Sequence, residues 1–154
     1  MKTKKLLYTP QKKAQIIGDF VNVMLGSKMY RSYDIEDIEA VIFPAIHLNQ
    51  FRLYHQNNQA VAFFTWAKLS KEIEQQYIIN NKNLTIDEWN SGENYWVMDF
   101  SAPYGHAKQV LKDLKYNIFP NTEAKALKVD KDGNVRTVIK VFGNNIKQKK
   151  QKRL

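Results

Sequence analysis

The sequence of 154 residues contains no cysteine. Disulfide bonds, thiolate nucleophiles and cysteine-based zinc sites are therefore excluded, and a cytoplasmic location is expected. The sequence also lacks an apolar run of about 18 residues, the length that predicts a membrane-spanning helix. At the start, Leu6 to Tyr8 is too short an apolar stretch to follow the basic residues as the core of a signal peptide. We expect neither a membrane span nor a secretory signal.

Acidic residues are absent from both ends of the chain, and this absence accounts for most of the net charge of +9. The ranges 1–6 and 147–154 hold eight of the 24 lysines and arginines, which leaves 16 basic against 15 acidic residues elsewhere. A basic tail can bind nucleic acid, an acidic membrane surface or an acidic protein, or it can simply be solvated. Because no aromatic residue lies among the C-terminal lysines, a nucleic-acid partner is not expected.

Hydrophobic residues make up 44% of the chain and aromatic residues 12%, which predicts an ordered core of one domain. We predict a basic N-terminal extension (1–8), a folded domain (9–146) and a basic C-terminal tail (147–154). Thr9 and Pro10 are typical of the start of a helix, which Gly26 is expected to end. Asp34 is predicted to cap a second helix, and Pro44 to end it.

The rest of the chain alternates between strand-like and helix-like patterns. Further helices are predicted from Ser70, as a short turn at 87–89, and from His106 to Tyr116 with Val110, Leu111 and Leu114 facing inward. Strands are predicted at 50–54 and 60–66 as a hairpin, from Tyr95, and at 126–129 and 135–142 with a turn at 130–134 between them. Gly143 is expected to close the folded part. The fold class is therefore α/β (α+β), with a mostly antiparallel central sheet flanked by helices.

The segment from Tyr95 to Gly105 is predicted to be a short buried strand that runs into a turn. Asp99 lies in its apolar part, where a carboxylate is strongly destabilised unless it is paired or hydrogen-bonded. An acid at the end of a buried strand is typical of catalytic groups in α/β enzymes. Alternatively, Asp99 caps the backbone of the turn at 103–105, and the pattern leaves both interpretations open.

The three histidines are widely spaced and do not predict a metal site. His55 lies in the hairpin turn and is expected to be exposed, whereas His47 is expected to be a partly buried structural residue. His106 follows Asp99 by seven residues, so it either faces that carboxylate across the turn as a base or is exposed at the start of a helix. The sequence contains no glycine-rich phosphate loop, no HExxH motif and no GxSxG motif.

A series of short motifs runs along the body of the chain: Phe43-Pro44-Ala45-Ile46, Asn49-Gln50-Phe51, Val61-Ala62-Phe63-Phe64-Thr65-Trp66-Ala67, Leu69-Ser70, Trp89-Asn90-Ser91-Gly92, Trp96-Val97-Met98-Asp99, Ala102-Pro103-Tyr104-Gly105, Phe119-Pro120 and Val129-Asp130. In these motifs the sequence resembles the toxin-activating lysine acyltransferases, which attach fatty acyl groups from acyl carrier protein to lysines of RTX protoxins. The spacing agrees without a gap from about Gly18 to Gly105, and the resemblance weakens after residue 130.

The resemblance implies a GNAT-like fold, no bound cofactor, and acyl carrier protein, an acidic partner, as the acyl donor. It also implies a catalytic histidine in the loop after the first helix and a catalytic aspartate in the central strand. Asp99 falls at the aspartate position, Tyr30 at the histidine position and Arg31 at that of the basic residue after it. Arg31, Trp66 and Tyr104 are candidates for binding the substrate or the partner. A homodimer is left open.

Tyr30 changes the chemistry that this position can supply. An imidazole with a pKa of about 6.5 takes a proton from an amine at neutral pH, whereas a phenol with a pKa of about 10 is almost wholly protonated. Tyr30 can still donate a hydrogen bond to a carbonyl or to a developing oxyanion. Three interpretations stay open: His106 or His47 supplies the base, the reaction differs, or the protein is a non-catalytic scaffold.

Divergent proteins that resemble this family occur in siderophore-microcin gene clusters. They act with a dedicated partner protein to join a glucosylated catecholate siderophore to the C-terminal serine of a microcin precursor. A chain that keeps Asp99 but has Tyr30 at the histidine position fits that branch. In either case the expected function is that of an acyltransferase-like protein, which modifies a toxin or bacteriocin polypeptide in the cytoplasm before export.

Overall fold

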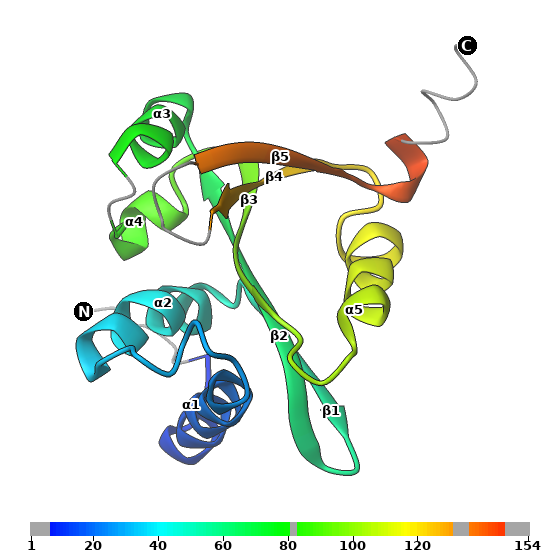
Figure 1. The fold of residues 1–154 in the computed structure, drawn as a ribbon. Coiled ribbons are helices and arrows are strands. Elements are labelled where there is room, and N and C mark those ends of the chain that lie inside the picture. The colour runs from blue at the N-terminus through cyan, green and yellow to red at the C-terminus, as the bar shows by residue number, and fades with distance from the viewer. Residues whose placement is uncertain (1–6, 81–82, 131–135, 147–154) are drawn as a thin grey trace.

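The computed structural model describes residues 7–80, 83–130 and 136–146. The basic C-terminal tail, most of the N-terminal extension and most of the turn predicted at 130–134 lie outside these residues. The described part forms a five-stranded sheet with helices on both faces (Figure 1). In chain order its elements are α1 (Pro10–Leu25), α2 (Ile35–Leu48), β1 (Phe51–Gln56), β2 (Gln59–Leu69), α3 (Lys71–Asn80), α4 (Ile86–Trp89), β3 (Asn94–Ser101), α5 (Ala107–Asp113), the π-helical turn η1 (Leu114–Ile118), β4 (Glu123–Val129) and β5 (Arg136–Phe142).

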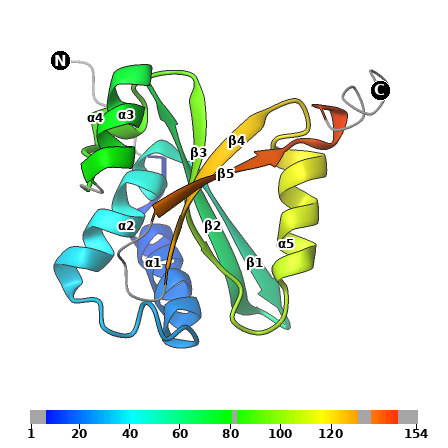
Figure 2. The ribbon, with the colours of Figure 1, turned by 45° about the horizontal axis from the view of Figure 1, so that its top comes forward.

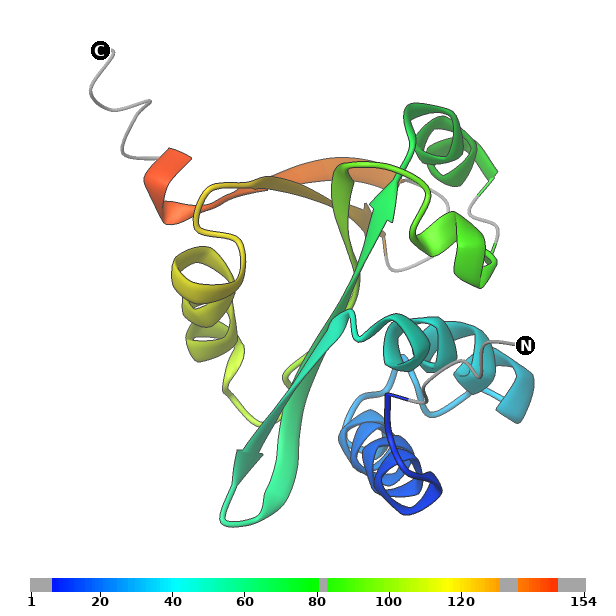
Figure 3. The same cartoon turned by 180° about the vertical axis from the view of Figure 1, so that it is seen from behind.

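The strands lie across the sheet in chain order, from β1 at one edge to β5 at the other. The β3–β4 pair is parallel, and the other neighbouring pairs are antiparallel. A parallel pair needs a crossover connection, which here runs through α5 and η1 on one face of the sheet. Helices α1 to α4 cover the opposite face (Figure 3). The predicted α/β domain with a mostly antiparallel sheet is confirmed, and the architecture is consistent with a single GNAT-like domain.

The parallel pair β3–β4 is short, and the two strands diverge beyond it. Its register joins Tyr95 to Ala124, Trp96 to Lys125 and Val97 to Ala126. Beyond these pairs, β4 and β5 cross the direction of β1–β3 at a wide angle (Figure 2). The half of β3 that carries Asp99 is therefore not paired with β4.

Helix α1 begins as predicted, because the side chain of Thr9 accepts a hydrogen bond from the backbone N–H of Lys12 and Pro10 occupies the first turn. Its apolar face, with Phe20 fully buried, packs on Phe63 of β2 at 4.9 Å between ring centroids. Gly26 follows the helix as predicted, but for a different reason. Its φ of −81° suits any residue, whereas a Cβ atom there would collide with the Tyr104 side chain.

Helix α2 begins at the predicted cap, where Asp34 and Asp37 form a reciprocal capping box. The predicted end at Pro44 is wrong: the helix continues to Leu48 and ends at Asn49, whose φ of 54° is left-handed. A proline removes one hydrogen bond from the helix interior. Pro44 is itself buried, together with the two residues that follow it, and this apolar burial favours continuing the helix.

The predicted hairpin is confirmed as β1 and β2, with Asn57 and Asn58 at its turn. Both asparagines have positive φ, 52° and 63°, which is the backbone geometry of a tight two-residue turn. The helix predicted from Ser70 is also confirmed, since the Ser70 hydroxyl accepts a hydrogen bond from the backbone N–H of Ile73. The short turn predicted at 87–89 is α4, which is capped by Thr85.

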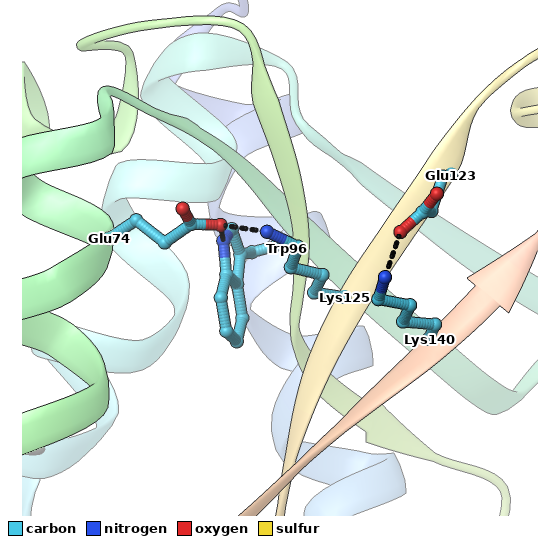
Figure 4. Close-up of polar contacts among 5 residues, drawn as sticks. All are labelled: Glu74, Trp96, Glu123, Lys125 and Lys140. Carbon is cyan, nitrogen blue, oxygen red and sulfur yellow. Dashed lines mark hydrogen bonds and ion pairs between the residues drawn. The ribbon is translucent and has the colours of Figure 1, made fainter.

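Glu74 connects α3 to two strands through a buried polar cluster (Figure 4). Its Oε1 accepts a hydrogen bond of 2.9 Å from Nε1 of Trp96 on β3 and lies 2.7 Å from Nζ of Lys125 on β4. Lys125 also lies over the Trp96 ring, 6.0 Å from its centroid. The cluster therefore holds α3 against the sheet at the point where β3 and β4 are paired. Nearby, Lys140 and Glu123 form a second ion pair, between β5 and β4.

On the opposite face, Val110 and Leu114 are buried as predicted, but Leu111 is exposed. Leu111 points away because the helix covers the sheet with a narrower stripe than the sequence suggested. The expectation that Gly143 closes the folded part is also wrong, since residues 144–146 are helical and the backbone N–H of Asn145 donates to the Pro120 carbonyl. Among the described helices, none has the length and apolar character needed to cross a membrane.

Candidate active site

A β-bulge in β3 determines which face of the sheet receives the Asp99 side chain. Thr65 of β2 is opposite Asp99 and Trp66 is opposite Val97, so Met98 is an extra residue in β3. In regular alternation Asp99 would lie on the face opposite Met98. The extra residue brings both side chains to the face covered by α1 to α4, and bulges commonly re-aim side chains in this way beside active sites.

Two hydrogen bonds fix Asp99. Oη of Tyr30 donates to Oδ1 of Asp99 at 2.9 Å, and the backbone N–H of Asp99 donates to the Thr65 hydroxyl at 3.1 Å. Thr65 is fully buried, so its hydroxyl orients the backbone at the bulge. The structure therefore joins Asp99 to Tyr30, which lies 69 residues earlier in the chain. The alternative prediction, that Asp99 caps the turn at 103–105, does not describe this carboxylate contact.

Tyr30 lies in the connection between α1 and α2 and is 4% exposed. Its backbone N–H donates to the Ser27 carbonyl at 3.2 Å. Its ring meets Tyr33 edge-on with centroids 5.2 Å apart, and it packs against Phe63 at 5.9 Å. A turn of backbone and two aromatic neighbours thus hold the phenol in place against Asp99.

Burial changes the acid–base properties of this pair. Removal from water raises the pKa of Asp99 to about 7, although the hydrogen bond from Tyr30 opposes part of that rise. Burial and the neighbouring carboxylate raise the pKa of Tyr30 far above its ordinary value. The pKa values of Tyr33 and Tyr77 rise for the same two reasons, burial first and Asp99 second. At neutral pH Asp99 can therefore gain or lose a proton, while Tyr30 keeps its own.

Asp99 and Tyr30 line a cavity of about 390 Å³ on the side of the sheet covered by α2, α3 and α4. The cavity reaches from β3 to β4 because the two strands no longer pair there. Polar atoms of the cavity wall include those of the tyrosines and Asn83. Most of the other residues around the cavity are aromatic or aliphatic: Met29, Tyr33, Ala40, Val41, Tyr77, Leu84, Trp89, Val97, Met98, Phe100, Ala126, Leu127 and Val129. A cavity of this size with one convergent polar pair has the form of a small-molecule or side-chain site.

Of the three residues predicted to bind the substrate or partner, two lie beside the loop that carries Tyr30, and one lies on the other face of the sheet. Arg31 is exposed, and its Nη1 donates to the Leu25 carbonyl at the end of α1 at 3.0 Å. Tyr104 is 55% exposed and lies over Gly26, next to the loop that carries Tyr30. Trp66 lies on the opposite face of the sheet, packed edge-on against Phe119 at 5.4 Å. Arg31 and Tyr104 therefore flank the loop of Tyr30, whereas Trp66 belongs to the core under α5.

The histidines lie away from the Tyr30–Asp99 pair. His106 lines a separate pocket of about 250 Å³ between the hairpin and α5, with its Nε2 3.2 Å from Oε1 of Gln56. His55 is exposed as predicted, but it lies in β1 and not in the hairpin turn, because the turn is confined to Asn57 and Asn58; its Nε2 lies 2.9 Å from Oδ2 of Asp19. His47 is exposed on α2, so the expected partial burial is wrong; it points outward from the last helical turn. Across the described ranges no group of three or more metal-binding side chains comes together.

Sequence reasoning missed three residues of the site. Thr65 is a lone hydroxyl in the apolar run Phe63 to Ala67, and that contrast was a usable signal for a buried polar role. Tyr33 and Tyr77 gave no such signal, because tyrosines three residues after Tyr30 or on the apolar side of a helix are ordinary core residues. Their position around Asp99 comes from the tertiary structure alone.

Several proteins similar to this chain are named lysine acyltransferases. A family model described as the RTX toxin acyltransferase family matches residues 9–143. An uncharacterised protein of Synechocystis sp. is 43% identical over 121 residues, which cover 77% of this chain and 82% of that protein. The RTX-I toxin-activating lysine-acyltransferase ApxIC of Actinobacillus pleuropneumoniae is 30% identical over 135 residues, with 88% and 78% covered. The protein-lysine myristoyltransferase RtxC of Kingella kingae is 25% identical over 133 residues, with 86% and 79% covered.

Proposed function

The chain belongs to the RTX toxin acyltransferase family, and from this premise we propose that it transfers a fatty acyl group to a lysine of a toxin polypeptide. One observation carries the proposal: a carboxyl group with a pKa of about 7, hydrogen-bonded to Tyr30, lies in the wall of a large cavity. A lysine amine must lose a proton as it attacks an acyl carbonyl, and a base that titrates near neutral pH is suited to take it. Asp99 is the proposed base.

The donor in this proposal is a fatty acyl thioester of acyl carrier protein, and the reaction takes place in the cytoplasm before the toxin is exported. An acidic carrier is attracted by a chain with a net charge of +9, which raises the rate of encounter. Acyl transfer from a thioester needs no cofactor bound to the enzyme. The exposed Arg31 and Tyr104, beside the loop of Tyr30, are the proposed contacts for the carrier or the acceptor polypeptide.

A reconstituted reaction tests the proposal. The full chain is mixed with myristoylated acyl carrier protein and the RTX-I toxin polypeptide, and peptide masses are used to locate acylated lysines. We expect acyl-lysine and free carrier thiol to form in equal amounts, and Asp99→Asn to lower the rate by a factor of about 10² or more. A folded Asp99→Asn variant that acylates at the normal rate would defeat catalysis by Asp99, and would favour a non-catalytic scaffold.

A second candidate function follows from Tyr30. The chain keeps Asp99 but has a phenol where the family has a histidine, and this departure favours a different acceptor, the C-terminal serine hydroxyl of a microcin precursor. In that version a partner protein is needed, and the transferred group is a glucosylated catecholate siderophore. The reconstitution distinguishes the two candidates, since acyl-lysine formed without any partner protein excludes the microcin version.

A further inference from the structure

We propose that Tyr30 contacts the acceptor itself and relays the acceptor's proton to Asp99. This inference rests on the proposed acyl transfer. It replaces direct proton transfer from the lysine amine to Asp99 with a transfer that passes through Tyr30. The acceptor nitrogen hydrogen-bonds to Oη of Tyr30 rather than to the carboxylate. Tyr30 is then a catalytic residue, and Asp99 receives the proton at one remove.

The geometry at Oδ1 supports a relay. Tyr30 donates its only hydroxyl proton to Oδ1 of Asp99 at 2.9 Å, which leaves the phenol oxygen as an acceptor for a second hydrogen bond. Both side chains line the cavity, so a group that enters it meets the phenol oxygen and the carboxylate together. The Thr65 hydroxyl and the rings of Tyr33 and Phe63 fix the two partners, and a fixed pair is what a rapid double transfer needs.

The ionisation of the pair requires the two proton movements to occur together. Burial and Asp99 raise the pKa of Tyr30 so far that a free phenolate does not form near neutral pH. Tyr30 can accept the acceptor's proton only if its own proton leaves for Asp99 in the same step. Among the residues that the structure describes, the ionisable groups that act on Asp99 are Tyr30, Tyr33 and Tyr77. Only Tyr30 of these three donates a hydrogen bond to the carboxylate, so only Tyr30 can take part.

The step balances as follows. The nitrogen of a neutral lysine amine bonds to the carbonyl carbon of the acyl thioester, and its proton passes to Oη of Tyr30 while the hydroxyl proton of Tyr30 passes to Oδ1 of Asp99. The carbon–sulfur bond breaks, and the thiolate leaves with the electron pair. The proton then returns from Asp99 through Tyr30 to the sulfur. The products are an amide and a thiol, and both side chains regain their starting state.

Single-turnover rates in mixtures of light and heavy water test the relay, with myristoylated acyl carrier protein and the RTX-I toxin polypeptide as substrates. For the unmodified chain we expect a curved dependence of the rate on deuterium content, because two protons move in one step. Tyr30→Phe should lower kcat by a factor of about 10² and make the dependence linear. Tyr54→Phe is the matched control, since its hydroxyl also donates to a carboxylate, that of Asp113, but on the opposite face of the sheet, and it should keep both the rate and the curvature.

Fluorotyrosine at position 30 covers the case in which Tyr30→Phe does not fold. It keeps the ring and the hydrogen bond but makes the phenol more acidic, so the limiting rate should change, whereas fluorotyrosine at position 54, on the opposite face of the sheet, should change nothing. A linear dependence in the unmodified chain, or an unchanged limiting rate with fluorotyrosine at position 30, would overturn the relay and leave the acyl transfer standing. No acyl-lysine from the unmodified chain would instead overturn the proposed function, and the relay with it.

Discussion

Asp99 titrates near neutral pH because it is shielded from water, and its hydrogen bond from Tyr30 limits how far its pKa rises. Withdrawal alone would hold the carboxyl group in its neutral form, and the hydrogen bond from Tyr30 returns part of the stability of the ionised form. The balance places its pKa at about 7. Both states of this carboxyl group are therefore populated near neutral pH, where the proposed acyl transfer needs a group that can take up a proton.

Activity should depend on the ionised form of Asp99. The single-turnover rate, divided by the fraction of acceptor amine that is neutral, should rise with pH and level off above a midpoint of about 7. Tyr30→Phe removes the hydrogen bond that lowers the pKa of Asp99, so any residual activity should have a higher midpoint. The measurement should extend over about two pH units on either side of that midpoint. A corrected single-turnover rate that does not depend on pH over this range would exclude Asp99 as the proton acceptor.

Asp99→Asn should stabilise the fold at neutral and alkaline pH. A carboxyl group whose pKa is raised on folding favours the folded state when it is protonated, and that contribution is lost as the pH rises from the unfolded pKa of about 3.9 through the folded pKa. The advantage of the asparagine variant in free energy of unfolding should therefore be small below about pH 4. It should grow by about 1.4 kcal/mol per pH unit up to pH 7 and then stay constant.

Urea unfolding at a series of pH values measures this difference. The asparagine side chain keeps an oxygen that can accept the hydrogen bond from Tyr30, so the comparison isolates the charge. A difference between the two proteins that is the same at every pH would show that Asp99 is not titrating near 7 in the folded state.

At the scale of elements, two glycines with opposite surroundings give a matched pair. Gly18 lies in the middle of α1 and has nothing within 4 Å of an added Cβ atom, whereas a Cβ atom at Gly143 would collide with the backbone carbonyls of Phe119 and Pro120. Gly18→Ala should raise the free energy of unfolding by about 0.5–1 kcal/mol, and Gly143→Ala should lower it by about 1–3 kcal/mol. Thermal or urea unfolding of both variants checks the contrast, and a neutral Gly143→Ala would contradict the close approach of β5 to the segment after η1.

Most elements could be predicted from the sequence because their signals are local. Thr9 and Asp34 cap helices wherever the chain carries them, and the Asn57-Asn58 pair makes a tight turn from its own backbone preferences. The end of α2 was wrongly predicted at Pro44, because burial of the residues around this proline outweighs the loss of one helical hydrogen bond. That burial depends on the whole fold and has no local signal in the sequence. Gly26 was placed correctly for the wrong reason, since Tyr104 approaches it from 78 positions further along the chain.

The site divides along the same line. Asp99 was visible as an acid in an apolar strand, and the resemblance placed Tyr30 with it as the second catalytic position, but no local pattern in the sequence shows their contact. The bulge at Met98 could not be predicted, because it is defined by the pairing of β3 with β2, and nothing in the sequence distinguishes Met98 from its apolar neighbours in the strand. For the same reason His106 was an attractive candidate in the sequence: it is near Asp99 in the chain, but it belongs to another pocket.

At the scale of the whole molecule, the Glu74 cluster joins the helical layer to the strands that bound the cavity. Lys125→Met removes one partner of a carboxylate that is 8% exposed, while Trp96 continues to donate to it. We expect the free energy of unfolding to fall by about 1–3 kcal/mol, because a buried acceptor loses a charged donor. Lys140→Met, which breaks the exposed pair with Glu123, should cost about 0.5 kcal/mol and serves as the control.

Acyl transfer should also respond to Lys125→Met if α3 forms a wall of the active cavity. Tyr77 of α3 lines the cavity and meets Trp96 edge-on at 5.3 Å, so a shift of α3 changes the shape of the site as well as the stability of the fold. The expected result is a raised KM with little change in kcat. An unchanged KM in a variant with the predicted loss of stability would show that the cluster supports the fold without shaping the cavity.

The single extra residue at Met98 reverses the faces to which the following residues of β3 point. Side chains alternate between the two faces of the sheet, and the extra residue shifts this alternation by one position for all residues after it. The face that receives the Asp99 carboxylate therefore depends on the presence of the extra residue and not on a change of any side chain. Deleting one residue at the bulge would turn the Asp99 side chain toward the face covered by α5, where Phe64 and Phe119 lie, and away from Tyr30. In this fold the count of residues, as much as their chemistry, selects the side of the molecule that can be reactive.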